Sequence, residues 1–325
     1  MIQCKKLSRD FKIYTKRQGF KGTLRSFVKR DHYINSAVKD FDLELNDPGL
    51  VGLLGPNGSG KTTLMKMFTG IIIPSRGELK VLNEIPGHRK RIFRKNISLV
   101  MGQKSQLWWD IPVMDSFLLF QRYYEIEEKT FKQRVSELGE RLNTKKLFHV
   151  PVRKLSLGER MKMELMACLL HEPKVIFLDE PTIGLDIVAQ KNVRAFLKDY
   201  YQEKKPLIVL TSHYMADVEA LCEKIILILE GEKKFEGSIN DFKSRFRKEK
   251  TVVFNFEEEV KNFPKEWEKK FYCEWNQDRS QLKIRSPEKD IKKIVIQILS
   301  QFSVSDFHTE KVGIEEIMDE ILSNV

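Results

Sequence analysis

The sequence predicts an α/β protein: a parallel β-sheet core with a helical insert, followed by a small α+β domain. Two runs of almost continuous apolar residues, 174–179 and 207–211, are typical of parallel strands that are buried on both faces. A helix predicted at about 187–203 joins them, and residues 112–172 are expected to be mainly helical. This alternation of strands and helices favours the α/β class.

The N-terminal region is expected to begin with two strands, over residues 1–14 and 36–45, separated by a basic insertion at about 15–35. The apolar run 50–54 is a further strand, and it leads directly into a glycine-rich loop. Residues 97–101 are expected to form another buried strand.

The character of the sequence changes beyond about residue 240. The expected order there is strand, helix, two strands, helix and strand, which suggests a ferredoxin-like domain. We therefore expect an N-terminal domain over 1–240, with a helical subdomain at about 104–172, and a C-terminal domain over 241–325. The elements expected in the C-terminal domain are a strand at 251–256, a polar, helical segment at 257–267, a hairpin at 270–286 that turns at 276–278, an amphipathic helix at 287–302, a strand near 304–308 and a helix from 314.

The 325 residues carry a formal net charge of +11, and this charge is unevenly distributed. Residues 1–40 contain eleven Lys and Arg against three Asp, a local excess of eight positive charges, and a second basic cluster spans 89–95. Such patches suit an anionic membrane surface, an acidic partner or nucleic acid. A solvated basic face without a dedicated ligand is an equal alternative.

Several classes of protein are disfavoured by the sequence. No apolar run approaches the length of a membrane-spanning helix, and the first residues lack the apolar region of a signal peptide, so we expect a cytoplasmic chain. The four cysteines are far apart and form no C-x-x-C pair. We therefore expect reduced thiols instead of a metal site or a disulfide framework.

The glycine-rich loop between the strand at 50–54 and the following helix has the pattern of a phosphate-binding P-loop. Its glycines let consecutive backbone N–H groups turn inward, and the helix start adds the positive end of a dipole. Lys61 can reach the β- and γ-phosphates of a nucleotide, and the Thr62 hydroxyl can bind Mg²⁺. The residues of this loop are Gly55, Pro56, Asn57, Gly58, Ser59, Gly60, Lys61, Thr62 and Thr63.

Two further motifs support phosphate chemistry. Asp179 and Glu180 end an apolar strand, where Asp179 can hold Mg²⁺ through water and Glu180 can act as general base toward an attacking water. Ser156 and Glu159 have the spacing of a capping box before an apolar helix. Because Gly158 lies in the first turn, this helix start is also an anion site, and the Ser156 hydroxyl can donate its proton to a phosphate.

Taken together, these motifs resemble the ATP-binding subunit of an ABC transporter, and the resemblance covers roughly residues 1–240. It implies a P-loop NTPase core with a signature motif at 156–159. The resemblance also implies that Gln103 senses Mg²⁺ and the membrane partner, that His213 contacts the γ-phosphate, and that Asp186, in the D-loop, belongs to the nucleotide site. The cofactors implied are ATP and Mg²⁺.

The resemblance implies that an aromatic residue of the first strand stacks on adenine. Phe11 fits best, Tyr14 is second and Tyr33 third, and an aromatic ring that merely packs is the alternative. The signature departs from the commonest family form, because Leu157 replaces a glycine and Glu159 replaces a glutamine. We still expect a working site, with the negative charge of Glu159 offset by Arg160.

The partners implied are a second copy of the chain, arranged head to tail, and separate membrane-spanning permease subunits. The adjacent Trp108 and Trp109 are candidates for docking to the permease, since Trp is favoured at interfaces. The sequence resembles ATPases of ABC-2-type export systems, so we expect an ATP-hydrolysing export subunit on the inner face of the cell membrane. The alternatives are the ATPase of a polysaccharide or teichoic-acid exporter and an ABC ATPase that acts on ribosomes or DNA, although no nucleic-acid partner is expected.

Overall fold

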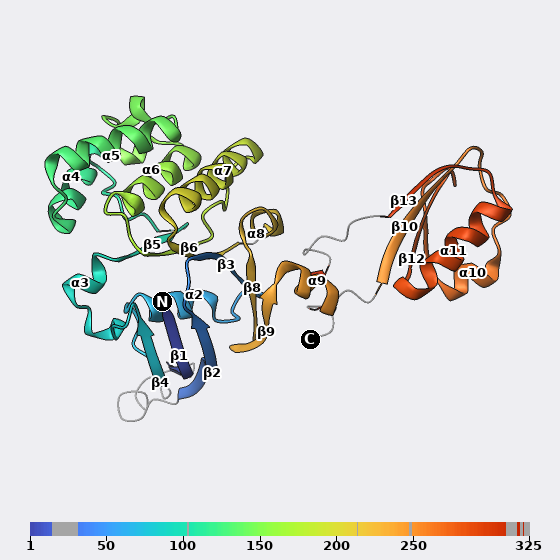
Figure 1. The fold of residues 1–325 in the computed structure, drawn as a ribbon, viewed down its shortest axis with the longest axis horizontal. Coiled ribbons are helices and arrows are strands. Elements are labelled where there is room, and N and C mark those ends of the chain that lie inside the picture. The colour runs from blue at the N-terminus through green and yellow to red at the C-terminus, as the bar shows by residue number, and fades with distance from the viewer. Residues whose placement is uncertain are drawn as a thin grey trace, which may run out of the picture. The chain divides into compact units, whose positions relative to one another are not determined.

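The computed structural model describes residues 1–14, 32–102, 104–212, 214–246, 249–309, 317–318 and 321. The chain divides into two compact units, Met1–Ile239 and Asn240–Val325 (Figure 1). The predicted domain boundary lies one residue from this division. The basic insertion predicted at 15–35 lies outside the described residues except for its last four positions, which begin strand β2.

A six-stranded sheet forms the centre of the first unit. Its strand order is β5-β6-β7-β3-β8-β9, in which all neighbours are parallel except the antiparallel pair β8 and β9. The prediction of parallel strands buried on both faces is confirmed, because all five residues of β7 are buried. The strands are β3 (Gly49–Leu54), β5 (Ile97–Met101), β6 (Val175–Asp179), β7 (Leu207–Thr211), β8 (Lys224–Leu229) and β9 (Glu232–Ser238).

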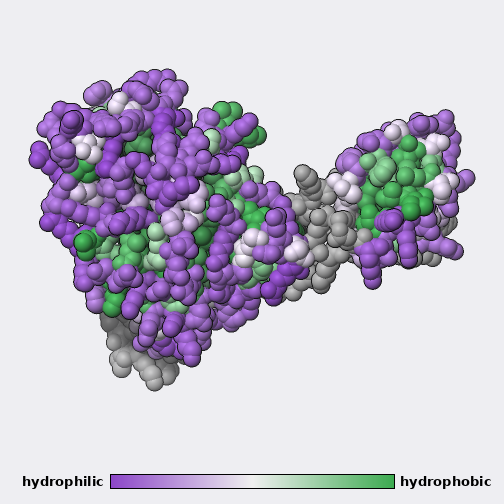
Figure 2. All heavy atoms as spheres, viewed as in Figure 1, coloured by the Kyte–Doolittle hydropathy of each residue, from purple (hydrophilic) through white to green (hydrophobic). Residues whose placement is uncertain are grey.

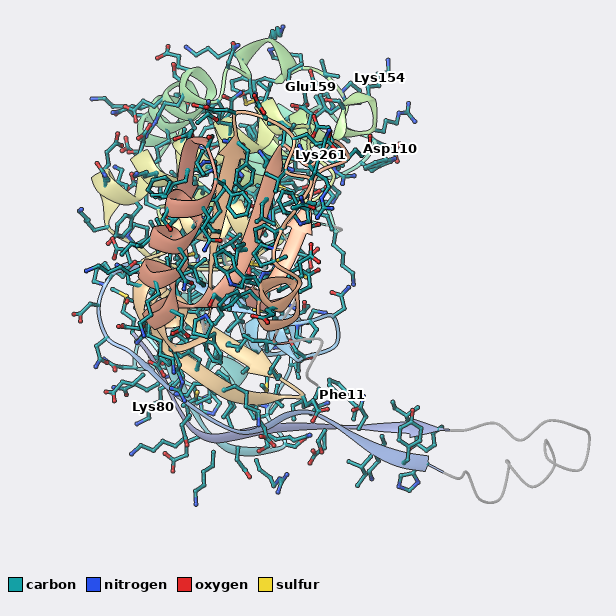
Figure 3. The ribbon with its side chains drawn as sticks, turned by 90° about the vertical axis from the view of Figure 1, so that its right-hand side faces the viewer. Phe11, Lys80, Asp110, Lys154, Glu159 and Lys261 are labelled. Carbon is teal, nitrogen blue, oxygen red and sulfur yellow. The ribbon has the colours of Figure 1, made fainter. Side chains whose placement is uncertain are left out.

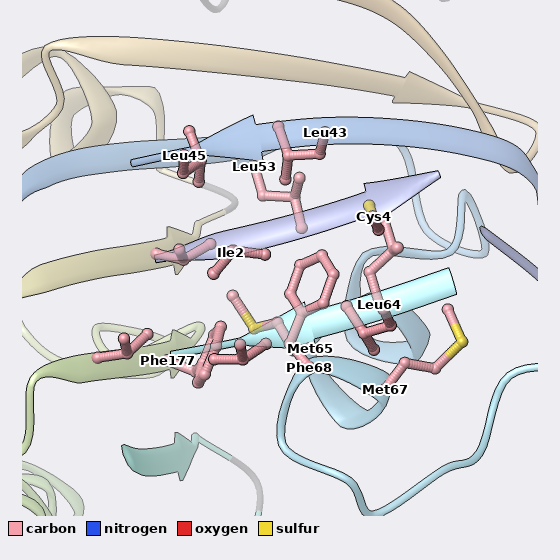
Figure 4. Close-up of a cluster of buried hydrophobic side chains, with 14 of the residues drawn as sticks. Ile2, Cys4, Leu43, Leu45, Leu53, Leu64, Met65, Met67, Phe68 and Phe177 are labelled. Carbon is pink, nitrogen blue, oxygen red and sulfur yellow. The ribbon is translucent and has the colours of Figure 1, made fainter. Parts of the chain in front are cut away.

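A second, antiparallel sheet of three strands lies beside helix α2 (Lys61–Phe68) in the order β2-β1-β4. These strands are β1 (Ile2–Tyr14), β2 (His32–Leu45) and β4 (Arg76–Val81). The side chains of both sheets and of α2 form one hydrophobic cluster, in which the rings of Phe68 and Phe177 lie 6.0 Å apart (Figure 4). Burial of these apolar side chains therefore fixes α2, and the loop before it, against both sheets.

The predicted helical subdomain consists of three longer helices, α4 (Val113–Tyr124), α5 (Glu128–Arg141) and α6 (Leu157–Leu169), with the short 3₁₀ helices η2 (Lys145–Leu147) and η3 (Val152–Lys154). Helix α6 packs against α4, α5 and strand β5. Most of α6 is buried, which explains why its sequence lacks a clear polar face. The remaining elements of this unit are η1 (Pro86–His88), α3 (Arg91–Arg94), α7 (Ile187–Lys204) and α8 (Met215–Leu221).

The second unit contains an antiparallel sheet in the order β11-β12-β10-β13. With helices α10 (Lys265–Lys270) and α11 (Glu288–Gln301), this is the βαββαβ arrangement predicted from the sequence. Helix α10 begins after Pro264, later than the start of the helical segment predicted at 257–267. The helix expected from residue 314 lies mostly outside the described residues. The elements are α9 (Ile239–Phe246), β10 (Glu249–Phe256), α10 (Lys265–Lys270), β11 (Tyr272–Trp275), β12 (Gln281–Pro287), α11 (Glu288–Gln301) and β13 (Val304–Thr309).

The surface of the first unit is mainly hydrophilic on the face shown in Figure 2, with hydrophobic residues limited to separate patches. Within the described residues, no helix is both long enough and apolar enough to cross a bilayer. All four cysteines are free, as predicted; Cys4, Cys168 and Cys222 are buried.

Candidate nucleotide-binding site

The loop between β3 and α2 is shaped by glycines that no other residue could replace without movement. Gly55 and Gly60 have φ angles of 149° and 106°. A Cβ atom on Gly55 would lie 2.1 Å from the carbonyl oxygen of Ile228, and one on Gly60 would lie 2.3 Å from that of Ala37. The backbone of the loop is therefore held between β8 and β2, in a glycine-rich conformation of the kind that presents backbone N–H groups to an anionic ligand.

Lys61, the first residue of α2, is only 7% exposed. Its Nζ donates to the carbonyl oxygens of Gly55 at 2.7 Å and Pro56 at 2.9 Å. Burial lowers the pKa of this ammonium, and the nearby carboxylates of Glu180 and Asp179 oppose the shift. A partly desolvated cation at the mouth of a glycine loop is suited to a phosphate group, because charges attract more strongly away from bulk water.

Three oxygen-bearing side chains meet at the carboxyl edge of the parallel sheet. The Thr62 hydroxyl donates to Asp179 Oδ2 at 2.9 Å, and the Thr211 hydroxyl donates to Asp179 Oδ1 at 2.8 Å. A hydroxyl beside a carboxylate is a donor set that suits Mg²⁺, which takes few protein ligands and keeps the rest of its shell for water and phosphate. Two of the three residues predicted for the metal, Thr62 and Asp179, thus lie together and fit that ion, while the third, Gln103, lies outside the described residues.

Glu180 directly follows β6 in a left-handed conformation, with φ 57°. Its backbone N–H is held by the carbonyl oxygen and the hydroxyl of Thr211, at 3.2 and 3.1 Å. Non-glycine residues adopt this conformation at an energetic cost that folded proteins concentrate at functional sites. The turn leaves Glu180 beside Asp179 at the edge of the sheet where ligands of α/β proteins bind.

The capping box predicted at the start of α6 is present. Ser156 Oγ accepts from the Glu159 N–H at 3.3 Å, and one Glu159 carboxylate oxygen accepts from both the N–H and the hydroxyl of Ser156 at 2.9 Å. These hydrogen bonds lower the pKa of Glu159, so its carboxylate stays ionised at neutral pH. The Ser156 proton that was predicted to reach a phosphate is therefore donated to Glu159 here.

The neighbours of the signature explain how it tolerates its unusual residues. A Cβ atom on Gly184, whose φ is 70°, would lie 2.6 Å from Leu157 Cδ2, so the Leu157 side chain covers this glycine. The predicted offset of Glu159 by Arg160 has less support, because the Arg160 guanidinium lies over the Trp109 ring at 5.8 Å. Lys146 and Lys162 contribute instead to the lowered pKa of Glu159.

Asp186, predicted in the nucleotide site, is the N-cap of α7. Its Oδ1 accepts from the backbone N–H of Ala189 at 2.8 Å. A Cβ atom on Gly158 would lie 3.6 Å from the Ala189 side chain, so the first turns of α6 and α7 lie next to each other. The signature and the turn at Asp186 therefore form one surface.

The register of the β1–β2 ribbon orders the three aromatic candidates. Ala37 contacts Gly60 of the loop, and Phe11 pairs with Asn35, two residues or about 7 Å along the strand from Ala37. Tyr33 is four residues from Ala37, and Tyr14 pairs one residue further out, about 17 Å away. This supports Phe11 as the first candidate, but it places Tyr33 nearer the loop than Tyr14, the reverse of the order predicted for these two tyrosines. Arg9 already lies over one face of the Phe11 ring, at 4.6 Å.

Two predicted site residues, Gln103 and His213, lie outside the described residues. The signature and the ribbon that carries Phe11 lie at opposite ends of the first unit, as the labels of Glu159 and Phe11 show in Figure 3. Sequence reasoning missed Thr211. The only feature of the sequence that pointed to Thr211 was a hydroxyl residue at the end of an apolar strand. Its contact with Asp179 depends on β6 being the strand next to β7.

The fold and these groups define a nucleotide-binding α/β protein of the P-loop class. Residues 38–183 match the protein family described as ABC transporter. The ABC transporter ATP-binding protein NatA of Bacillus subtilis (strain 168) is 30% identical over 220 residues, which is 68% of this chain and 88% of that protein. The chain therefore belongs to the ATP-binding proteins of the ABC transporter family, and it is an ABC-type ATPase.

Other relatives and structures agree with this assignment. The Nod factor export ATP-binding protein I of Rhizobium sp. (strain N33) is 34% identical, and that of Ralstonia nicotianae (strain ATCC BAA-1114 / GMI1000) is 36% identical. These matches cover 58% and 57% of this chain and 61% and 57% of those proteins, less than two thirds of each. In fold, the chain is similar to an ATP-binding subunit of an ABC transporter (TM-score 0.63, 21% identity, 75% of this chain and 92% of that one). It is also similar to the ATP-binding cassette MJ0796, which was solved as a dimer bound to ADP and Pi (TM-score 0.61, 20% identity, 74% of this chain and 99% of that one).

The glycine contacts predict different effects for two alanine substitutions in the same loop. Gly60→Ala is expected to lower ATP affinity about 100-fold, about 2.7 kcal/mol, because the new methyl group would collide with the Ala37 carbonyl. Gly58 also has a positive φ, 82°, but no atom lies where its Cβ would be. For Gly58→Ala we therefore expect only the free-energy cost of holding alanine in a left-handed backbone conformation, about 1–2 kcal/mol. Titration with a fluorescent ATP analogue measures both, and equal losses would contradict the role given to the Ala37 contact.

Proposed function

We propose that two copies of the chain associate head to tail and enclose two ATP molecules. Each nucleotide would then lie between the P-loop of one copy and the signature of the other. The observation that carries this proposal is the separation of Glu159 from Phe11 within one chain: the signature lies far from the β1–β2 ribbon, which contacts the chain's own P-loop at Gly60. Two such chains complete each other's sites.

Within each site, we assign the chemistry to the residues at the sheet edge. Lys61 and the loop amides bind the phosphates, and Thr62 and Asp179 hold Mg²⁺, which would neutralise developing charge during hydrolysis. Glu180 accepts a proton from the attacking water. His213 and Gln103 are assigned to the γ-phosphate and to Mg²⁺ by resemblance to the family.

Loss of the γ-phosphate removes the bridge between the two copies, because Ser156 and Gly158 no longer have an anion to bind. The pair then opens, and this two-state change can move a membrane partner. We propose that the partner is a pair of permease subunits and that the chain works on the inner face of the cell membrane. Export is the favoured direction, because two of its relatives are named as export proteins.

The surface near Trp108 and Trp109 supports docking to such a permease. Both rings are about half exposed, at 49% and 50%, although Trp108 also packs against Phe120 with 5.7 Å between ring centroids. Exposed tryptophans of this kind often anchor protein interfaces. The basic cluster at 89–95 belongs to the same unit. Glu84 and Glu125 pair with three of its five basic side chains, and the positive excess that is left suits the anionic headgroups of an inner membrane surface.

Substitution of the proposed base tests the ATPase cycle. Glu180→Gln is expected to lower ATP turnover by about 100-fold or more, because an amide cannot accept the proton of water. MgATP should then hold the chain as a stable dimer, measurable by analytical ultracentrifugation. Glu203→Gln, which removes a carboxylate from the far end of α7, is the control and should leave turnover unchanged. Near-normal turnover of Glu180→Gln would exclude this residue as the base.

The charge of Glu159 provides a second test of the dimer. The Glu159 carboxylate accepts a hydrogen bond from the Ser156 hydroxyl and would lie near the partner's γ-phosphate, which it would repel. Glu159→Gln in the Glu180→Gln background should therefore tighten ATP-dependent dimerisation about fivefold. Glu137→Gln, on the exposed face of α5, controls for overall charge. A weaker dimer with Glu159→Gln would show that the capping box matters more than the repulsion.

Membrane fractionation tests the permease docking. In its native cells, the wild-type chain should sediment with membranes. It should remain there after a high-salt wash, because salt weakens only the electrostatic contacts with the membrane and not the docking to the permease. The double substitution of Trp108 and Trp109 by Ala should release it into the supernatant. If the wild-type chain instead followed ribosomes or nucleic acid, the proposed membrane coupling would be wrong.

A further inference from the structure

A buried carboxylate that the ATPase mechanism does not use lies behind the catalytic loops. Asp217, in α8, is 1% exposed. Its Oδ1 accepts from the Arg194 guanidinium at 2.6 Å. Its Oδ2 accepts from the Ser212 hydroxyl at 2.6 Å and from the Thr182 hydroxyl. Both oxygens of one side chain are thus bound by donors from three separate segments.

These three segments are the ones that carry the proposed catalytic groups. Thr182 lies in the turn after β6, two residues beyond Glu180. Ser212 follows β7 and precedes position 213, and its hydroxyl also accepts from the Tyr214 N–H at 3.0 Å. Arg194 belongs to α7, the helix that Asp186 caps. A single carboxylate therefore hydrogen-bonds to the loop that follows β6 and to the loop that follows β7.

Burial and charge pairing make the hydrogen-bond network around Asp217 rigid. Thr182 is 1% exposed and Ser212 is 6% exposed, so neither hydroxyl can exchange its partner for bulk water without an opening of the structure. The Arg194 side chain is mostly buried and neutralises the carboxylate, as a buried charge requires. Because the network is fully paired, each of its members has one defined position.

We propose that Asp217 is a positioning residue for ATP hydrolysis, which it serves by holding Thr182 and Ser212 so that the turn after β6, which carries Glu180, keeps a fixed spacing from the end of β7. This inference rests on the proposed function of those two loops. Asp217 itself does not touch the nucleotide. Its effect should therefore fall on the chemical step and not on ATP binding, because only the chemical step depends on sub-ångström placement of the water-activating groups.

The test removes the hydrogen bond of each loop to Asp217 and leaves the buried ion pair intact; in Ser212→Ala the bond from the Tyr214 N–H is lost as well. Thr182→Val and Ser212→Ala are each expected to lower kcat about 10-fold, while the KM for ATP stays within about twofold of wild type. Thr182→Ser keeps the hydroxyl and should restore kcat. Substitution of Asp217 or Arg194 would be a less specific test, because an unpaired buried charge is strongly destabilising.

A matched control separates positioning from general stability. Thr144 is also fully buried and bonded through its hydroxyl, to Gly139 O and Met166 Sδ, but it lies in the helical subdomain. Thr144→Val should lower the midpoint of thermal unfolding as much as Thr182→Val does, with kcat unchanged. An equal fall of kcat in both variants, or an unchanged kcat in Thr182→Val and Ser212→Ala, would overturn the proposal. The Glu180→Gln variant is measured alongside: if it also turned over normally, the proposed function of the loops would fail first.

Discussion

The bonding of Asp179 is the constraint on which the rest of the site depends. Its two carboxylate oxygens are held by hydroxyls from α2 and β7, at 2.9 and 2.8 Å, so one side chain fixes the P-loop helix against two neighbouring strands. The hydrophobic cluster beneath brings α2 to the sheet but is non-directional, and it cannot alone set the angle of the helix. Directional hydrogen bonds at the sheet edge complete what burial begins.

The glycine loop and the carboxylates have complementary electrostatic roles. Lys61 is buried near Asp179 and Glu180, which favour its charged form against the cost of burial. The same carboxylates would repel a triphosphate unless a cation stood between them and the ligand. A Mg²⁺ ion held by Thr62 and Asp179 would resolve this conflict, so we expect binding of the metal and of the nucleotide to be interdependent.

The local parts of this molecule could be predicted from its sequence, while the long-range parts could not. The P-loop, the strand ending at Asp179 and the capping box at Ser156 are encoded by neighbouring residues, and each was predicted in place. The pairing of β1 with β4 joins segments about 70 residues apart, and no local pattern indicates it. Thr211 and Asp217 were missed for the same reason, because their partners come from other elements. The helix predicted within 257–267 begins only after Pro264, because proline suits the start of a helix better than its interior.

The two departures in the signature differ in their physical meaning. The Leu157 side chain packs over Gly184, where any side chain larger than hydrogen would clash with it. The glycine therefore provides the space that the leucine fills. Glu159 is compensated only in its charge, by Lys146 and Lys162. Its ionised carboxylate still accepts the hydrogen bond that the Ser156 hydroxyl could otherwise donate to a phosphate. In the proposed dimer, the partner's γ-phosphate would compete with this internal anion for the Ser156 hydroxyl. Closure would then break the bond between Glu159 and that hydroxyl, while the bond from Glu159 to the Ser156 backbone N–H would keep the helix capped.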